Sequence, residues 1–173
     1  MTAAAAGLWA RLSAETALAL ALLTTTDVWA PRPQVPLSFG VAIGACVGVT
    51  LVVLLAGKRP GRGALVRERR RLVVAKGLVL GVGSASEEVL WRWFAIGALA
   101  PEIGLLPAYA TSTIGFALAH GHPKAVLVHL LTGSAFGGVY LLTGSLIASI
   151  ATHVAYNLIV LLAVETSRTL HPT

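Results

Sequence analysis

The sequence has little charge, almost no cysteine and few aromatic residues. Only 12% of its 173 residues are Asp, Glu, Lys or Arg, whereas soluble domains carry about 25%. With 56% hydrophobic residues and a mean hydropathy of +0.81, much of the surface is expected to face lipid. The single cysteine, Cys46, excludes an intrachain disulfide and a Cys-rich metal site. Its apolar surroundings predict a small buried residue.

What the sequence has instead is long apolar segments. A membrane-spanning helix needs roughly 20 mostly apolar residues. Six candidate segments lie at about 8–29, 37–57, 72–100, 105–120, 124–142 and 145–164. The first resembles a signal peptide in length, but Glu15 and Pro31 favour a retained helix. The sequence therefore predicts an all-α, polytopic membrane helix bundle with about six transmembrane helices, in one domain of residues 1–173.

Glycines recur at four-residue spacing in the second segment, as Gly40, Gly44 and Gly48. This spacing places them on one helix face, which suits close helix packing either within the fold or between protomers. A homo-oligomer therefore stays open as an alternative.

The positive charge is concentrated in one loop. Seven of the 13 Lys and Arg residues lie between Lys58 and Arg71. The positive-inside rule makes this loop cytoplasmic, and six crossings then place both termini in the cytoplasm. We expect a multi-pass protein of a bacterial plasma membrane. Because these cations flank apolar segments, no nucleic-acid partner is expected.

The third segment carries three charges, and each costs at least ~2.5–3.5 kcal/mol at membrane depth. Glu88 and Arg92 are four residues apart, so they share a helix face and can pair, whether for structure or to orient a site. Glu87 is left over, either neutral or solvated by water. A carboxylate with a captive water is a general-base arrangement. A lone membrane carboxylate also suits a proton-coupled transporter.

Other polar residues interrupt the later segments. His120 ends the fourth, and His153 and Asn157 share one face of the sixth. A rise of ~1.5 Å per residue puts these three and Glu87 at depths of roughly 12–22 Å, so three helices are expected to bring them to one layer. His153 and Asn157 could also serve interhelical hydrogen bonding alone. For Phe116 and for His129, ordinary packing is favoured.

Three ordered motifs carry a family resemblance. Residues 87–92 read EExxxR, residues 116–120 read FxxxH, and residues 153–157 read HxxxN. In this order on successive apolar helices, they resemble the CAAX protease and bacteriocin-processing (CPBP, or Abi) family of intramembrane endopeptidases. The resemblance covers about residues 72–164, the expected catalytic core. An N-terminal helical pair at about 8–57 precedes it.

The resemblance implies a role for each matching residue. Glu87 and His120 would activate a water molecule, and Glu88 with Arg92 would orient the site. His153 and Asn157 would hold the oxyanion, and this fits the chemistry of side-chain donors.

The resemblance also implies a metal-free, glutamic mechanism without a cofactor. Zinc held by the catalytic glutamate and the two histidines is a less favoured alternative, because no HExxH motif is present. The implied partner is a protein or peptide substrate at the lipid bilayer, cut near its C-terminus. Prenylated CaaX-like tails, bacteriocin maturation or self-immunity, and C-terminal sorting tails are the candidates. The small size of the chain favours the sorting tail, as in the myxosortase branch. The rival functions are a non-catalytic immunity or scaffold protein and a transporter.

Overall fold

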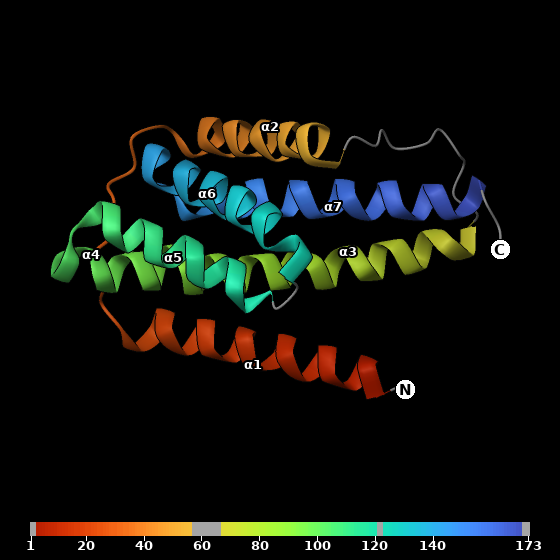
Figure 1. Ribbon diagram of the computed structural model, residues 1–173, viewed down its shortest axis with the longest axis horizontal. Helices are drawn as coiled ribbons and strands as arrows, with labels where there is room; N and C mark the ends of the chain where they lie inside the picture. Colours follow the sequence, from red (N-terminus) through yellow and green to blue (C-terminus); the bar gives the residue numbers. More distant parts are fainter. Residues whose placement is uncertain (1–2, 57–66, 121–122, 171–173) are drawn as a thin grey trace.

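The computed structural model describes residues 3–56, 67–120 and 123–170, and all regular structure in these ranges is helical (Figure 1). The helices are α1 (Ala3–Thr25), α2 (Leu37–Ala56), α3 (Arg67–Glu88), the π-helix η1 (Val89–Ile96), α4 (Gly97–Ile103), α5 (Leu105–Ala119), the 3₁₀ turn η2 (Pro123–Ala125), α6 (Val126–Thr143) and α7 (Leu146–Leu170). The backbone stays helical from α3 through η1 into α4, so these three form one continuous rod. The predicted all-helical bundle of six long segments is thereby confirmed.

Helices α1, α3, α7 and α2 form a row, and helices α5 and α6 lie across it. Helix α1 packs on α3, α3 on α7, and α7 on α2, while α5 and α6 pack together against η1 and α7 (Figure 1). Helix α1 begins at the same end of the bundle at which α7 ends. This is the arrangement that an even number of crossings produces. The orientation was predicted from a loop at Lys58–Arg71. Residues 58–66 lie outside the described residues, and residues 67–71 form the start of α3 and not a loop.

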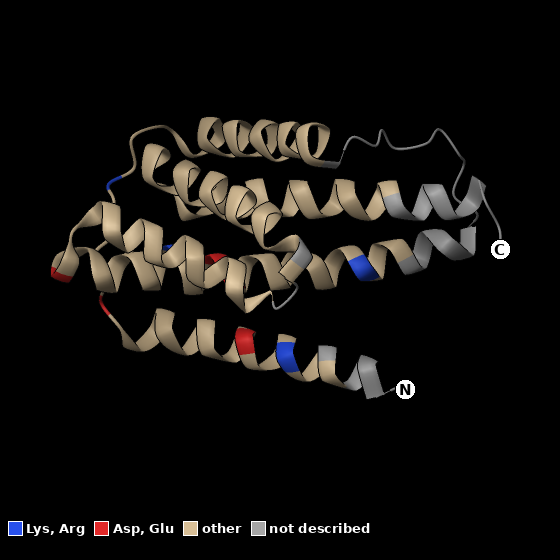
Figure 2. Ribbon diagram, in the orientation of Figure 1, with Lys and Arg blue, Asp and Glu red and all other residues tan. Residues whose placement is uncertain are grey.

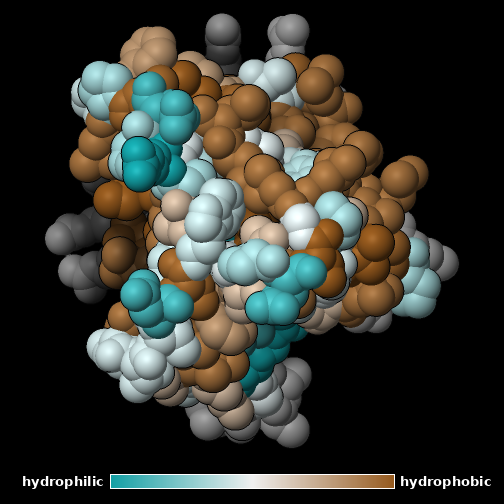
Figure 3. Space-filling model, turned by 90° about the vertical axis from the view of Figure 1, so that its left-hand side faces the viewer, coloured by the Kyte–Doolittle hydropathy of each residue, from teal (hydrophilic) through white to brown (hydrophobic). Residues whose placement is uncertain are grey.

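The surface suits a lipid environment. Three stretches, Leu37–Leu55, Val126–Thr143 and Leu146–Ala163, are long and apolar enough to cross a membrane, and α5 is a shorter apolar helix. Large hydrophobic side chains are exposed, and charges are sparse on the ribbon (Figure 2). Seen from the end near α4, broad hydrophobic areas surround scattered hydrophilic groups (Figure 3).

The predicted glycine face of α2 packs within the fold. A Cβ at Gly44 would lie 2.3 Å from the Ala148 carbonyl oxygen, and one at Gly48 would lie 2.4 Å from that of Thr152. Because the backbones of α2 and α7 approach so closely, side chains are excluded from this face. The prediction of a buried Cys46 is wrong, since this thiol is exposed. Cys46 is two residues from each of these glycines, so it points away from α7.

A glycine with a positive φ angle ends the long rod. The helix continues through Pro101 and ends at Ile103, and Gly104 adopts φ 88° before α5 begins. Side chains rarely adopt this conformation, so glycine suits the reversal. The predicted interruption at Pro101 and Gly104 is therefore made by the glycine.

Candidate active site

The two adjacent glutamates lie where the α-helical turn of α3 changes to the π-helical turn of η1. π-helical segments are rare and frequently occur at functional sites. Glu87 and Glu88 face different surroundings there. The Glu88 side chain is fully buried, whereas that of Glu87 is 14% exposed and lines a cavity. One helix turn therefore supplies one enclosed and one accessible carboxylate.

Glu88 is held by donors from two helical segments. Its Oε2 accepts hydrogen bonds from Arg92 Nε at 3.2 Å and from Ser149 Oγ at 2.5 Å. Its Oε1 accepts one from His153 Nδ1 at 2.9 Å. The predicted Glu88–Arg92 contact is thus made, with both side chains at 0% exposure. Such a pair tolerates burial because most of its polar atoms are satisfied. Among the described residues, Arg92 Nη2 is buried without a hydrogen-bond partner.

Arg92 is fixed by helix α5 as well. Its Nη1 donates to Ser112 Oγ at 3.1 Å, and that hydroxyl donates to the Trp91 carbonyl. The guanidinium carbon lies 4.9 Å from the centre of the Phe116 ring, a cation–π distance. The Glu88 network therefore joins η1, α5 and α7 into one rigid unit.

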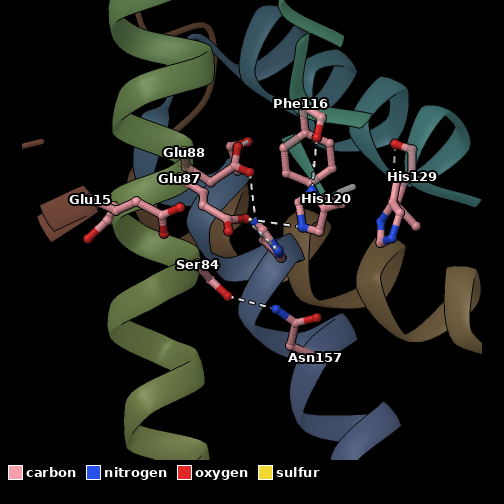
Figure 4. A network of polar contacts seen from close by, with 12 residues as sticks. Glu15, Ser84, Glu87, Glu88, Phe116, His120, His129 and Asn157 are labelled. Carbon is pink, nitrogen blue, oxygen red and sulfur yellow. Dashed lines mark hydrogen bonds and ion pairs between the residues drawn. The ribbon is translucent and has the colours of Figure 1, made fainter. Parts of the chain in front are cut away.

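Glu87 faces His120 (Figure 4) and also His153. Its Oε2 lies 3.7 Å from His120 Nε2 and 3.8 Å from His153 Nε2. These separations are too long for direct hydrogen bonds and leave room for a bridging water. The three side chains, which come from separate helices, converge at one level as the depth argument predicted.

The two histidines differ in what their Nδ1 atoms contact. His120 Nδ1 lies 2.8 Å from the Phe116 carbonyl oxygen. Because a carbonyl only accepts, Nδ1 carries a proton, and in the neutral form of the ring the Nε2 lone pair faces Glu87. His153 Nδ1 instead donates to the Glu88 carboxylate. The neutral Phe116 carbonyl therefore orients the His120 ring, and the anionic Glu88 carboxylate orients the His153 ring.

Aromatic rings enclose both histidines. The Phe116 ring lies 4.5 Å from the His120 ring and 5.8 Å from the His153 ring, centre to centre. Phe136 stacks on His153 at 4.4 Å, and His129 stacks on His120 at 4.2 Å. Ordinary packing was favoured for Phe116 and His129, but both lie against the converging histidines.

Asn157 lines the same cavity as His153. Its Nδ2 donates to Ser84 Oγ at 2.9 Å, which fixes the amide against α3. An amide nitrogen carries two hydrogens, so a second donor is left for a ligand. The predicted common face of His153 and Asn157 is present.

Helix α1 forms part of the wall of the cavity, whose volume is about 320 Å³. Arg11 Nε donates to Glu15 Oε1 at 2.6 Å, and Arg11 Nη2 lies 3.7 Å from Glu87 Oε1. Thr16 and Ser86 share a hydrogen bond of 3.1 Å that ties α1 to α3. The sequence analysis missed Arg11, although its four-residue spacing from Glu15 repeats that of Glu88 and Arg92.

No metal-ligand cluster is evident in residues 3–56, 67–120 and 123–170. No group of three or more His, Cys, Asp or Glu side chains in these ranges is arranged so that it could hold a metal ion. The zinc set considered from the sequence, Glu87 with His120 and His153, is therefore not such a group.

The comparisons with known proteins agree with the motifs. The sequence model of the family described as type II CAAX prenyl endopeptidase Rce1-like matches residues 70–159, more than half of the chain, and spans all three motifs. No curated protein and no solved structure matches the chain. With its apolar helices and this match, the chain belongs to the Rce1-like CAAX endopeptidase family, a family of membrane proteases within the CPBP group.

Proposed function

We propose that this protein hydrolyses a peptide bond near the C-terminus of a membrane-associated protein or peptide, using a water activated by Glu87 and His120. The observation that carries the proposal is the position of Glu87 Oε2, 3.7–3.8 Å from the Nε2 atoms of both histidines. A water in that gap meets two basic groups at once. Within general acid–base catalysis this is the arrangement that generates a nucleophile at neutral pH.

In the proposed first step, water attacks the scissile carbonyl carbon. A C–O bond forms, and the water proton passes to the Glu87–His120 pair. His120 suits this step because its Nε2 lone pair faces Glu87 while Nδ1 stays bound to the Phe116 carbonyl. When the C–N bond breaks, the same proton is returned to the leaving amine, so the pair is regenerated.

The developing oxyanion needs donors, and His153 and Asn157 are proposed to supply them. Asn157 has one amide hydrogen beyond its bond to Ser84. His153 donates from Nδ1 to Glu88, so a second donation from Nε2 requires the imidazolium form. Carboxylates flank that ring on both sides, since Glu88 Oε1 lies 2.9 Å from Nδ1 and Glu87 Oε2 lies 3.8 Å from Nε2. Preorganised donors of this kind typically contribute about 10²–10³-fold in rate each.

Glu88 and Arg92 are proposed to orient the site without touching the substrate. Both are fully buried, and Glu88 holds His153 from behind through its Oε1. A ring held at a carboxylate keeps one tautomer and one orientation. In this proposal, residues 72–164 form the catalytic core and the N-terminal pair 8–57 braces and closes it.

The substrate proposed is a C-terminal tail held at the membrane, with both termini of the enzyme in the cytoplasm. The family description favours a CAAX-like tail, and a sorting tail of the myxosortase type is the alternative. A prenylated CAAX peptide and an unprenylated sorting-tail peptide, each with a fluorophore and quencher flanking the cut, distinguish the two. Whichever is cleaved identifies the substrate class.

The test is cleavage of these peptides by purified protein in lipid nanodiscs. Glu87→Gln keeps the side-chain shape and removes the base, so we expect a rate loss of about 10²–10⁴-fold. The matched control is Glu102→Gln, an exposed glutamate on α4 whose loss should leave the rate unchanged. Full activity in Glu87→Gln would rule out the proposed mechanism.

A further inference from the structure

The wall of the cavity opposite the histidines is formed by α1, which lies outside the family match of residues 70–159. Arg11, Leu12 and Glu15 of this helix line the cavity. Apart from the histidines, Arg11 is the only cationic side chain among the described residues that do so. The mechanism proposed above leaves it without a role.

The guanidinium of Arg11 is anchored at one edge and open at the other. Its Nε bonds Glu15 Oε1 at 2.6 Å, while its Nη2 approaches Glu87 Oε1 only to 3.7 Å. Within the described part of the chain, Nη2 forms only this ion pair and neither Nη atom forms a hydrogen bond, so both can donate to a ligand in the cavity. A guanidinium fork matches the two oxygens of a carboxylate and binds them through two parallel, charge-assisted hydrogen bonds.

We propose that Arg11 binds the free α-carboxylate at the substrate's C-terminus and thereby selects substrates cut close to that end. This inference rests on the proposed peptidase function and names the substrate group that the site would recognise. Glu15 positions the guanidinium by holding Nε, so the fork stays directed at the cavity.

The position of Arg11 also limits the length of the released fragment. Nη2 lies next to Glu87, so the carboxylate anchor is close to the attacked bond. An extended peptide advances ~3.3–3.6 Å per residue. The cavity of about 320 Å³ is near the lower end of the ~300–1,000 Å³ typical of ligand pockets. Only a few residues fit between the cut and the anchor.

The competing interpretation is that Arg11 only fastens α1 to α3 through Glu87. That role predicts equal effects on every substrate, whereas a carboxylate anchor distinguishes a C-terminal acid from the corresponding amide. The amide keeps the shape of the tail and removes its charge, so the comparison isolates the proposed contact.

The binding experiment uses the full chain in lipid nanodiscs and the tripeptide Val-Ile-Ala as free acid or amide, measured by isothermal titration calorimetry. For the wild type we expect the acid to bind about 10-fold or more tightly than the amide, the size of a charge-assisted contact. Arg11→Gln should remove this preference, and Arg11→Lys should keep part of it. Glu15→Gln should weaken acid binding, because the contact that holds Arg11 Nε is weakened.

Arg32→Gln is the matched control, because Arg32 is an exposed arginine outside the cavity and its loss should preserve the preference. Equal binding of acid and amide by the wild type, or binding of neither, would overturn the proposal. Retention of the full preference in Arg11→Gln would do the same.

Cleavage kinetics separate this inference from the proposed function. With quenched peptides ending in an acid or an amide, Arg11→Gln should raise KM for the acid by about 10-fold and change kcat less than KM. If acid and amide are cut alike by the wild type and Glu87 is still required, only the carboxylate anchor fails. If Glu87→Gln cleaves normally, the proposed function itself fails.

Discussion

The two sides of the site, one built around Glu88 and the other around Glu87, differ in how tightly they are held. Glu88 is fully buried and accepts hydrogen bonds from three side chains at 2.5–3.2 Å. Glu87 is 14% exposed, and its ion-pair partners in the described part of the chain lie 3.7–3.8 Å away. A carboxylate with all its donors in place is structural, whereas one with a gap before it is open to water and substrate. In the proposed mechanism, these neighbouring residues of one helix therefore have separate roles: Glu88 supports the site and Glu87 activates the water.

The largest expected effect comes from breaking the Glu88 side. Arg92→Met removes the partner of a fully buried carboxylate and leaves that charge without its counter-ion. Losing one partner of a buried pair costs about 3–5 kcal/mol. We expect a large fall in the free energy of unfolding, measured by denaturation in mixed micelles. An unchanged midpoint would show that the Glu88 side does not depend on this pair.

The next effect concerns α2, which braces α7 behind Ser149 and His153. Gly44→Ala puts a Cβ 2.3 Å from the Ala148 carbonyl oxygen, so the two helices must separate. Overpacking of this kind costs about 1–3 kcal/mol. Activity should fall with stability, because α7 carries His153. Gly138→Ala is the control, since its Cβ would meet no atom within 4 Å.

The residues on the Glu87 side could be predicted from the sequence, whereas those that complete the Glu88 network could not. Glu87, His120 and His153 lie in three ordered motifs on separate apolar segments, so depth alone brings them to one layer. Ser149 and Ser112, which complete the Glu88 network, have no such spacing, and serines are common in membrane helices. Their partners are set by how α5 and α7 pack on η1, which is a tertiary property.

Local patterns also left the role of α1 undetermined. The four-residue spacing of Arg11 and Glu15 indicates a helix-face pair, but not which neighbouring helix that face meets. The same limit applies to His129, whose contact with His120 joins α6 to the end of α5. The π-helical turn after Glu88 has no sequence signature that we could read. The roles of α1 and His129 therefore depend on helix–helix contacts, which sequence periodicity does not predict.

A smaller effect is expected on the Glu87 side from His129. Its ring stacks on His120 at 4.2 Å, and loss of such a contact costs about 0.5–1.5 kcal/mol. His129→Ala should therefore lower kcat by roughly 2–10-fold through misplacement of His120. His129→Phe keeps a ring in place and should restore most of the rate. Equal losses in both variants would argue against stacking as its role.

The smallest expected effect is that of a chelator. The proposed mechanism uses Glu87 and His120 without a metal, so incubation with EDTA or 1,10-phenanthroline should leave the cleavage rate unchanged. Elemental analysis of the purified protein accompanies the assay. One tightly bound zinc per chain, together with activity that is lost on chelation and restored by zinc, would contradict the proposed glutamic mechanism and show that the reaction depends on zinc.

The most direct test of this division is a paired measurement of stability and cleavage in Glu87→Gln and Glu88→Gln. We predict that Glu87→Gln keeps the wild-type Tm and loses about 10²–10⁴-fold in cleavage rate. Glu88→Gln should lower the Tm, because it weakens bonds to Arg92, Ser149 and His153 at once. A stable, inactive Glu88→Gln beside an active Glu87→Gln would contradict the assignment of the two carboxylates.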